Sequence, residues 1–161
     1  MVTGKDYPPN WVVMPDSSLT AELVNRQWAK KPVIEIIGNR QGIFSLGNLL
    51  LWISFHSPDT ESLSITGLPF VHAKSALSLT VVQSDDYSDK YSKLVRMDKD
   101  QQFEWLIKDD ILQRQGLCLI DIAFTPHGFC GDHFHVYVGP DSEYELFFAR
   151  NDLRREFFPV D

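Results

Sequence analysis

A run of apolar residues in the first half of the chain most strongly limits what this sequence can fold into. Between Gln41 and His56 the pattern predicts a helix that is apolar on nearly every face, from Ile43 to Phe55. A helix of this kind has no polar side to present to water, so other elements must cover it on most sides. At 13 residues, interrupted by serine, glycine and asparagine, the run is too short to span a bilayer. We therefore expect a central helix in a globular core.

Strand-like segments surround this helix on both sides in the sequence. Val33 to Ile37 is rich in β-branched residues and is followed by the turn residues Gly38-Asn39, which predicts a strand that ends just before the helix. Near the end of the chain, 133–138 and 144–150 flank a Gly-Pro-Asp-Ser turn and predict a hairpin. Alternation and turn residues predict further strands at 63–66, 70–72, 77–81, 93–97 and 102–107.

Two further helices are expected from capping residues and stop signals. Asp16 or Ser17 can cap a helix that runs to about Lys31, where a proline ends the pattern. Asp109-Asp110 opens another helical pattern that ends before Pro126. The β-tolerant residues at its end leave open whether 110–124 is helical throughout.

This order of elements predicts an α+β protein with a single antiparallel or mixed sheet and two or three helices packed mainly on one face. The chain has 161 residues, a usual length for one domain, and no change in composition marks a linker. We therefore expect a single domain over residues 1–161, with an irregular N-terminal arm at the proline-containing residues 1–16.

The cysteine content and the N-terminal sequence indicate a compartment. Two cysteines are too few for a disulfide framework, so we expect reduced thiols. The opening residues MVTGKDYPPNW lack the apolar core of a signal peptide. The expectation is a cytoplasmic protein that needs no cofactor.

The net charge of −7 lies entirely in the second half of the chain. Residues 1–80 hold six basic and six acidic residues, whereas residues 81–161 hold nine basic and sixteen acidic ones. Such a charge disfavours nucleic acid and anionic membranes and favours a basic partner, although solubility alone can also explain it. The acidic residues expected in exposed loops and turns, and hence at a partner interface, are Asp85, Asp86, Asp89, Asp98, Asp100, Asp141, Glu143 and Glu145.

One cluster of histidines and cysteine offers an alternative function. His133 and His135 would point to the same face of a strand, and two imidazoles at that spacing can bind a metal together with His127 and Cys130. The alternative function is therefore a metal-dependent enzyme or metal-binding protein. A simpler interpretation places both histidines on the polar outer face of the hairpin. No nucleophile signature surrounds Cys130, and no catalytic residue is assigned.

Two stretches resemble a known family. IEIIGNRQGIFSLGNLLLWIS (34–54) is a strand, a glycine turn and an apolar helix, and GDHFHVYVGPDSEYELFFAR (131–150) is a histidine-containing hairpin. Together they resemble small bacterial immunity proteins of polymorphic toxin systems, over about a quarter of the chain. The resemblance implies a non-catalytic cytoplasmic protein that binds and blocks a toxin domain, here a basic one given the acidic half. A homodimer formed by sheet-edge pairing is a further option.

Overall fold

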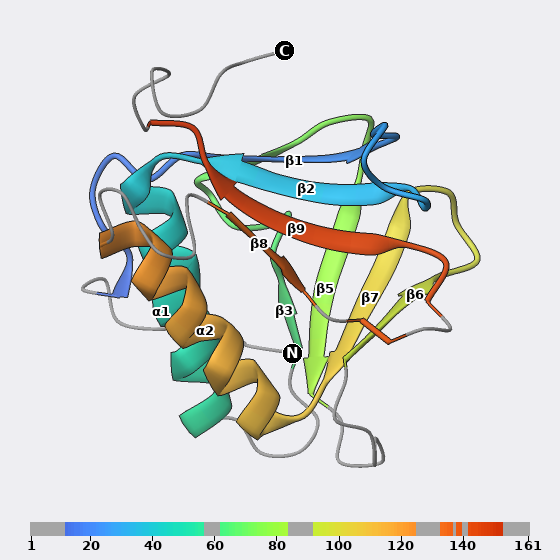
Figure 1. Cartoon of the computed structure of the whole chain (residues 1–161). Helices are drawn as coiled ribbons and strands as arrows, with labels where there is room; N and C mark the ends of the chain where they lie inside the picture. The colour runs from blue at the N-terminus through green and yellow to red at the C-terminus, as the bar shows by residue number, and fades with distance from the viewer. Residues whose placement is uncertain are drawn as a thin grey trace.

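The computed structural model describes residues 12–56, 62–83, 92–124, 133–136, 138–139 and 142–152, which form two sheets and two helices (Figure 1). The helices are α1 (Arg40–His56) and α2 (Asp109–Phe124). The strands are β1 (Leu19–Val24), β2 (Val33–Gly38), β3 (Ser62–Ser64), β4 (Val71–Ala73), β5 (Ser78–Gln83), β6 (Lys93–Arg96), β7 (Gln102–Ile107), β8 (His133–Val136) and β9 (Glu145–Arg150).

The strands belong to two separate mixed sheets, so the expectation of a single sheet is wrong. One sheet has five strands in the order β4-β1-β2-β9-β8, and the other has four in the order β3-β5-β7-β6. Parallel pairing joins β1 to β4, β2 to β9 and β5 to β7, and the remaining neighbours are antiparallel. The fold is α+β, with two helices in the described part of the chain.

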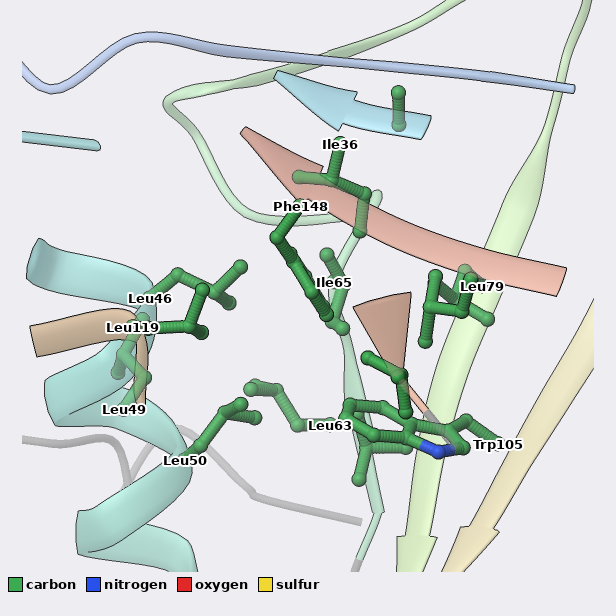
Figure 2. Close-up of a cluster of buried hydrophobic side chains, with 14 of the residues drawn as sticks. Ile36, Leu46, Leu49, Leu50, Leu63, Ile65, Leu79, Trp105, Leu119 and Phe148 are labelled. Carbon is green, nitrogen blue, oxygen red and sulfur yellow. The ribbon is translucent and has the colours of Figure 1, made fainter. Parts of the chain in front are cut away.

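The core explains why two sheets form instead of one. Ile36 and Phe148 from the five-stranded sheet and Trp105 from the four-stranded sheet point into a shared interior (Figure 2). Leu50 of α1 and Leu119 of α2 close a third side of it, and all five side chains are fully buried. Two helices are too few to cover one face of a nine-stranded sheet. The strands instead form two sheets, and the apolar faces of both sheets and of the helix pair cover one another in a single buried cluster.

The helix expected from Asp16 or Ser17 to Lys31 is also wrong, because its central part is strand β1. Leu19 and Ala21 are fully buried while Thr20 between them is partly exposed, which is the two-residue period of a strand. Every residue of β1 pairs with β2 in antiparallel register. The pairing with β2 thus outweighs the weak helical spacing of the apolar residues.

The other main predictions of local structure are confirmed. The central helix, the strand before it and the helix that opens at Asp109 are all present, and residues 110–124 are helical throughout. β8 and β9 form the expected antiparallel hairpin. Within the expected N-terminal arm the described residues are 12–16, of which Val12 is buried in the core.

Side chains from distant segments cap both helices at the same end of the helix pair. Asn39 Oδ1 accepts a hydrogen bond from Gly42 N at 2.8 Å, as expected for the residue before α1. Asp152 Oδ2 accepts one from Arg40 N at 3.0 Å. Burial opposes ionisation of Asp152, but hydrogen bonds from Arg150 and Arg40 outweigh it, so the pKa of Asp152 is lowered. The carboxylate therefore sits charged at the positive end of α1.

Arg150 caps the carboxyl end of α2. Its Nη1 donates to the carbonyl oxygens of Ile122 and Ala123 at 3.1 and 3.3 Å, and its Nε donates to Asp152 at 2.9 Å. A cation at the carboxyl end of a helix complements the helix dipole. The end of β9 thus connects the start of α1 to the end of α2.

The two helices approach each other closely through a pair of glycines. A Cβ atom at Gly47 would lie 2.8 Å from the carbonyl oxygen of Gly116, and one at Gly116 would lie 2.9 Å from that of Gly47. No side chain fits between the two backbones at this point. In the described part of the chain, neither helix is long and apolar enough to cross a membrane.

Gly47→Ala is expected to destabilise the fold by about 1–3 kcal/mol, although alanine is the better helix former. The added methyl group would contact the backbone of α2, which cannot move away as a flexible side chain can. Urea unfolding measures the loss, with Arg114→Ala on the exposed side of α2 as the control. A Gly47→Ala protein as stable as the wild type would show that the helices are not so closely packed.

Candidate functional site

The outer face of the five-stranded sheet carries a cluster of aromatic side chains at β8 and β9. Leu146 and Phe148 of β9 point into the core, so Glu145 and Phe147 point outward. His135 of β8 pairs with Phe147 in the antiparallel register, and His133 lies two residues before it on the same face. The alternation of β8 and β9 therefore brings both histidines, the phenylalanine and a carboxylate to one surface.

The loop between β1 and β2 adds a tryptophan to this surface. The Trp28 ring centroid lies 5.1 Å from that of His135 and 5.4 Å from that of Phe147, and 52% of the Trp28 residue surface remains exposed. The ring planes are inclined rather than parallel, at 81° and 46°. Trp28, His133, His135, Glu145 and Phe147 line a surface groove of ≈ 580 Å³. We call this feature the aromatic groove.

An ion pair positions the loop that carries Trp28. Arg26 donates from Nε and Nη2 to the two carboxylate oxygens of Glu35 on β2, at 2.8 and 2.6 Å. The Glu35 side chain is only 6% exposed, whereas that of Arg26 is 45% exposed. The carboxylate raises the pKa of Arg26 above its usual value, through the hydrogen bond first and the charge second. This two-pronged contact holds the loop over the outer face of the sheet.

The histidines and their neighbours determine the charge of the groove. Partial burial and the neighbouring His133 lower the pKa of His135, and the carboxylate of Glu145 opposes this shift. His135 is therefore mainly neutral near pH 7. Lys31 lines a smaller adjoining pocket of ≈ 330 Å³ with His135 and Glu145, and its Nζ donates to the carbonyl oxygen of Ser142.

The structure places only half of the proposed metal ligands. His133 and His135 are exposed neighbours, with ring centroids 5.6 Å apart, as the strand spacing predicts. His127 and Cys130 lie outside the described residues. Among the described residues no group of three or more His, Cys, Asp and Glu side chains is arranged to hold a metal ion. The metal site that includes His127 and Cys130 stays a prediction.

The acidic residues expected at a partner interface fall into two groups. Asp85, Asp86, Asp89 and Asp141 lie outside the described residues. Asp98 and Asp100 are exposed in the turn between β6 and β7, Glu143 is exposed just before β9, and Glu145 is half-buried in the aromatic groove.

Arg96 joins the turn between β6 and β7 to the segment before β9. It pairs with Asp100, and hydrogen bonds to Asp100 and then to Tyr144 raise its pKa. Arg96, Glu143 and Tyr144 also line one small pocket. Asp100, from the turn between β6 and β7, and Glu143, from the segment before β9, therefore both lie near Arg96.

Sequence reasoning missed the residues that build the groove. Trp28 was expected on a helix and Phe147 only as part of an apolar strand, and the Arg26–Glu35 pair was not foreseen. The available signal was a lone tryptophan inside the polar and charged stretch NRQWAKK, where its one apolar neighbour is the small Ala29. An isolated tryptophan in such surroundings favours an exposed aromatic side chain with a binding role.

Arg26→Met is expected to destabilise the protein by about 1–3 kcal/mol, because it leaves the buried Glu35 carboxylate without two hydrogen bonds. The loss of unfolding free energy should be smaller than the loss caused by breaking a fully buried ion pair, since Arg26 is about half exposed. Lys74→Met removes the exposed pair with Glu22 on the same sheet and is the control, with an expected loss of ~0–1 kcal/mol. Equal losses in urea unfolding would show that the Arg26 pair is an ordinary surface contact.

Acidification is expected to weaken the fold through His135. Its pKa is lower in the folded chain than the usual value of about 6.5, so the unfolded chain binds a proton there that the folded chain does not. The stability that the neutral His135 contributes is fully present at a pH above the pKa of the unfolded chain. It is lost as the pH falls from that value through the lowered pKa of the folded chain.

His135→Gln should therefore lose less stability than the wild type between pH 7.5 and pH 5.5 in denaturant unfolding. The control is His72→Gln, at an exposed position on β4, which removes a histidine and leaves His135 and its neighbours in place. An acid-induced loss that is the same in all three proteins would contradict this assignment.

Searches for similar proteins among family models, curated proteins and solved structures found no match to this chain.

Proposed function

We propose that this chain is a non-catalytic binding protein of the immunity type, which occupies and blocks a basic toxin domain in the cytoplasm. The observation that carries the proposal is the aromatic groove, where Trp28 and Phe147 lie beside the carboxylate of Glu145 on an open sheet face. Exposed aromatic side chains that are held in place by their neighbours are typical centres of protein interfaces.

The surroundings of the groove suit the rim of such an interface. A specific interface buries about 800 Å² on each partner. A partner that binds at the groove would therefore also cover the protein surface around it. Glu143 is exposed just before β9, and Asp98 and Asp100 are exposed in the turn that Arg96 joins to this segment. Carboxylates at a rim guide a basic partner into place and raise the association rate more than the final affinity.

The resemblance of residues 34–54 and 131–150 to immunity proteins supports the same proposal, since the aromatic groove uses the hairpin of the second stretch. The net charge of the second half of the chain fits a basic toxin domain, such as one that acts on nucleic acid. The proposal assigns no catalytic residue and no cofactor to this chain.

Co-expression with a basic toxin domain encoded beside this chain should relieve the growth arrest that the toxin causes.

In stopped-flow binding, the double variant Glu143→Gln with Glu145→Gln should associate severalfold more slowly at low salt. Its association rate should also depend less on salt, because salt screens exposed charges over about 8–10 Å. Replacement of Asp85, Asp86 and Asp89 by Asn tests whether that segment shares the contact.

A control with the same change in charge separates a local effect from a general one. Glu104→Gln with Asp121→Asn removes two carboxylates, from β7 and α2, outside the groove. This variant should associate at nearly the wild-type rate. A toxin domain that neither binds nor is inhibited would contradict the proposed function, and equal slowing in both double variants would contradict the proposed surface.

A further inference from the structure

We propose that the aromatic groove is a subsite for a guanidinium group, so that it receives an arginine side chain of the protein partner. This inference rests on the proposed function and adds to it the chemistry of the central contact. It concerns the five residues that line the groove, Trp28, His133, His135, Glu145 and Phe147.

The aromatic rings line the aromatic groove at an angle to one another and are not stacked face to face. Phe147 lies at the centre, with its centroid 5.0 Å from His135, 5.3 Å from His133 and 5.4 Å from Trp28. The Trp28 and Phe147 planes are tilted by 46° and the Phe147 and His135 planes by 56°. With about half of Trp28 exposed, aromatic surface is left open to the groove.

A cation is the ligand that these rings favour. The face of an aromatic ring carries partial negative charge, and tryptophan attracts cations most strongly of the three aromatic residues. Glu145 adds a carboxylate to the same groove. An apolar ligand would use the rings but would gain nothing from this carboxylate, and a neutral donor would gain only a hydrogen bond without the ionic attraction.

The other titratable groups near the groove leave it suited to a cation at neutral pH. His135 faces His133 on its own strand and Glu145 on β9, and burial together with His133 lowers its pKa. Lys31 lines the adjoining pocket and not the aromatic groove, and it donates to the Ser142 carbonyl oxygen. Protonation of His135 at lower pH would place positive charge in the groove and weaken cation binding.

Arginine fits this groove better than lysine does. Its guanidinium is planar, stacks on aromatic faces and is weakly hydrated, and it can donate two hydrogen bonds to one carboxylate. The lysine ammonium is compact and strongly hydrated, so moving it from water onto the rings is harder. Arginine is also enriched among the residues that dominate protein interfaces.

The test uses the isolated full chain and an NMR titration with N-acetylarginine methylamide. The matched control ligand is N-acetylcitrulline methylamide, which has nearly the same shape and no charge. We expect the Trp28 indole N–H and the His133 and His135 ring signals to shift with the arginine probe. The apparent affinity should exceed that for the citrulline probe by roughly threefold to tenfold at pH 7.5.

Four changes should reduce this binding in separable ways. Trp28→Ala should remove most of it, whereas Trp28→Phe should retain part, because phenylalanine still offers a ring face. Glu145→Gln should bring the two probes to similar affinity. Lowering the pH to 5.5 should weaken the arginine probe and leave the citrulline probe nearly unchanged. The amide spectrum of each variant checks that it is folded.

The outcomes for this inference and for the proposed function can be told apart. Equal binding of both probes, or arginine binding that is unaffected by Trp28→Ala in a folded protein, would overturn the guanidinium subsite. A toxin domain whose affinity is insensitive to Trp28→Ala and Glu145→Gln would overturn it as well, while the inhibitory function would stand. Selective arginine binding by a chain that inhibits no toxin domain would support the subsite and contradict the function.

Discussion

β9 lies between β2 and β8 in the five-stranded sheet, and its parallel pairing with β2 joins a segment from the first quarter of the chain to one from the last quarter. The register runs from Val33 opposite Glu145 to Gly38 opposite Arg150. At one end Glu145 N donates to the Pro32 carbonyl oxygen, and at the other Asn151 N donates to that of Gly38, both at 2.9 Å. Because the partners are more than a hundred residues apart, the sheet cannot close before most of the chain is in place.

The two faces of β9 have different roles, and both depend on this pairing. On the inner face Phe148 is fully buried near Trp105 of the other sheet, with ring centroids 6.1 Å apart. On the outer face Phe147 is the centre of the aromatic groove. Arg150, the last residue of the strand, and Asp152 just after it cap the two helices. A shift of β9 by one residue would exchange the faces and remove the core contact and the groove together.

The groove further depends on one contact of the loop between β1 and β2. Glu35 would be an unfavourable residue on a nearly covered part of β2 without the two hydrogen bonds from Arg26. The same bonds bring the loop, and with it Trp28, back across β2 to β9. A stability contact and a recognition surface thus share one short segment. This arrangement explains why an exposed tryptophan is held in a defined place.

Local pattern in the sequence was sufficient for the central helix, for β2, for α2 and for the hairpin of β8 and β9, because each has a strong period or a clear turn. It also placed His133 and His135 on one outer face, since a two-residue spacing does so in any strand. It was not sufficient for β1, whose weak helical spacing yields to pairing with β2. Nor did it show that the strands divide into two sheets, because strand partners are chosen by burial across the whole chain. Only the tertiary structure brought Trp28, Phe147 and Glu145 together, since their approach depends on a long-range parallel pairing and on one ion pair.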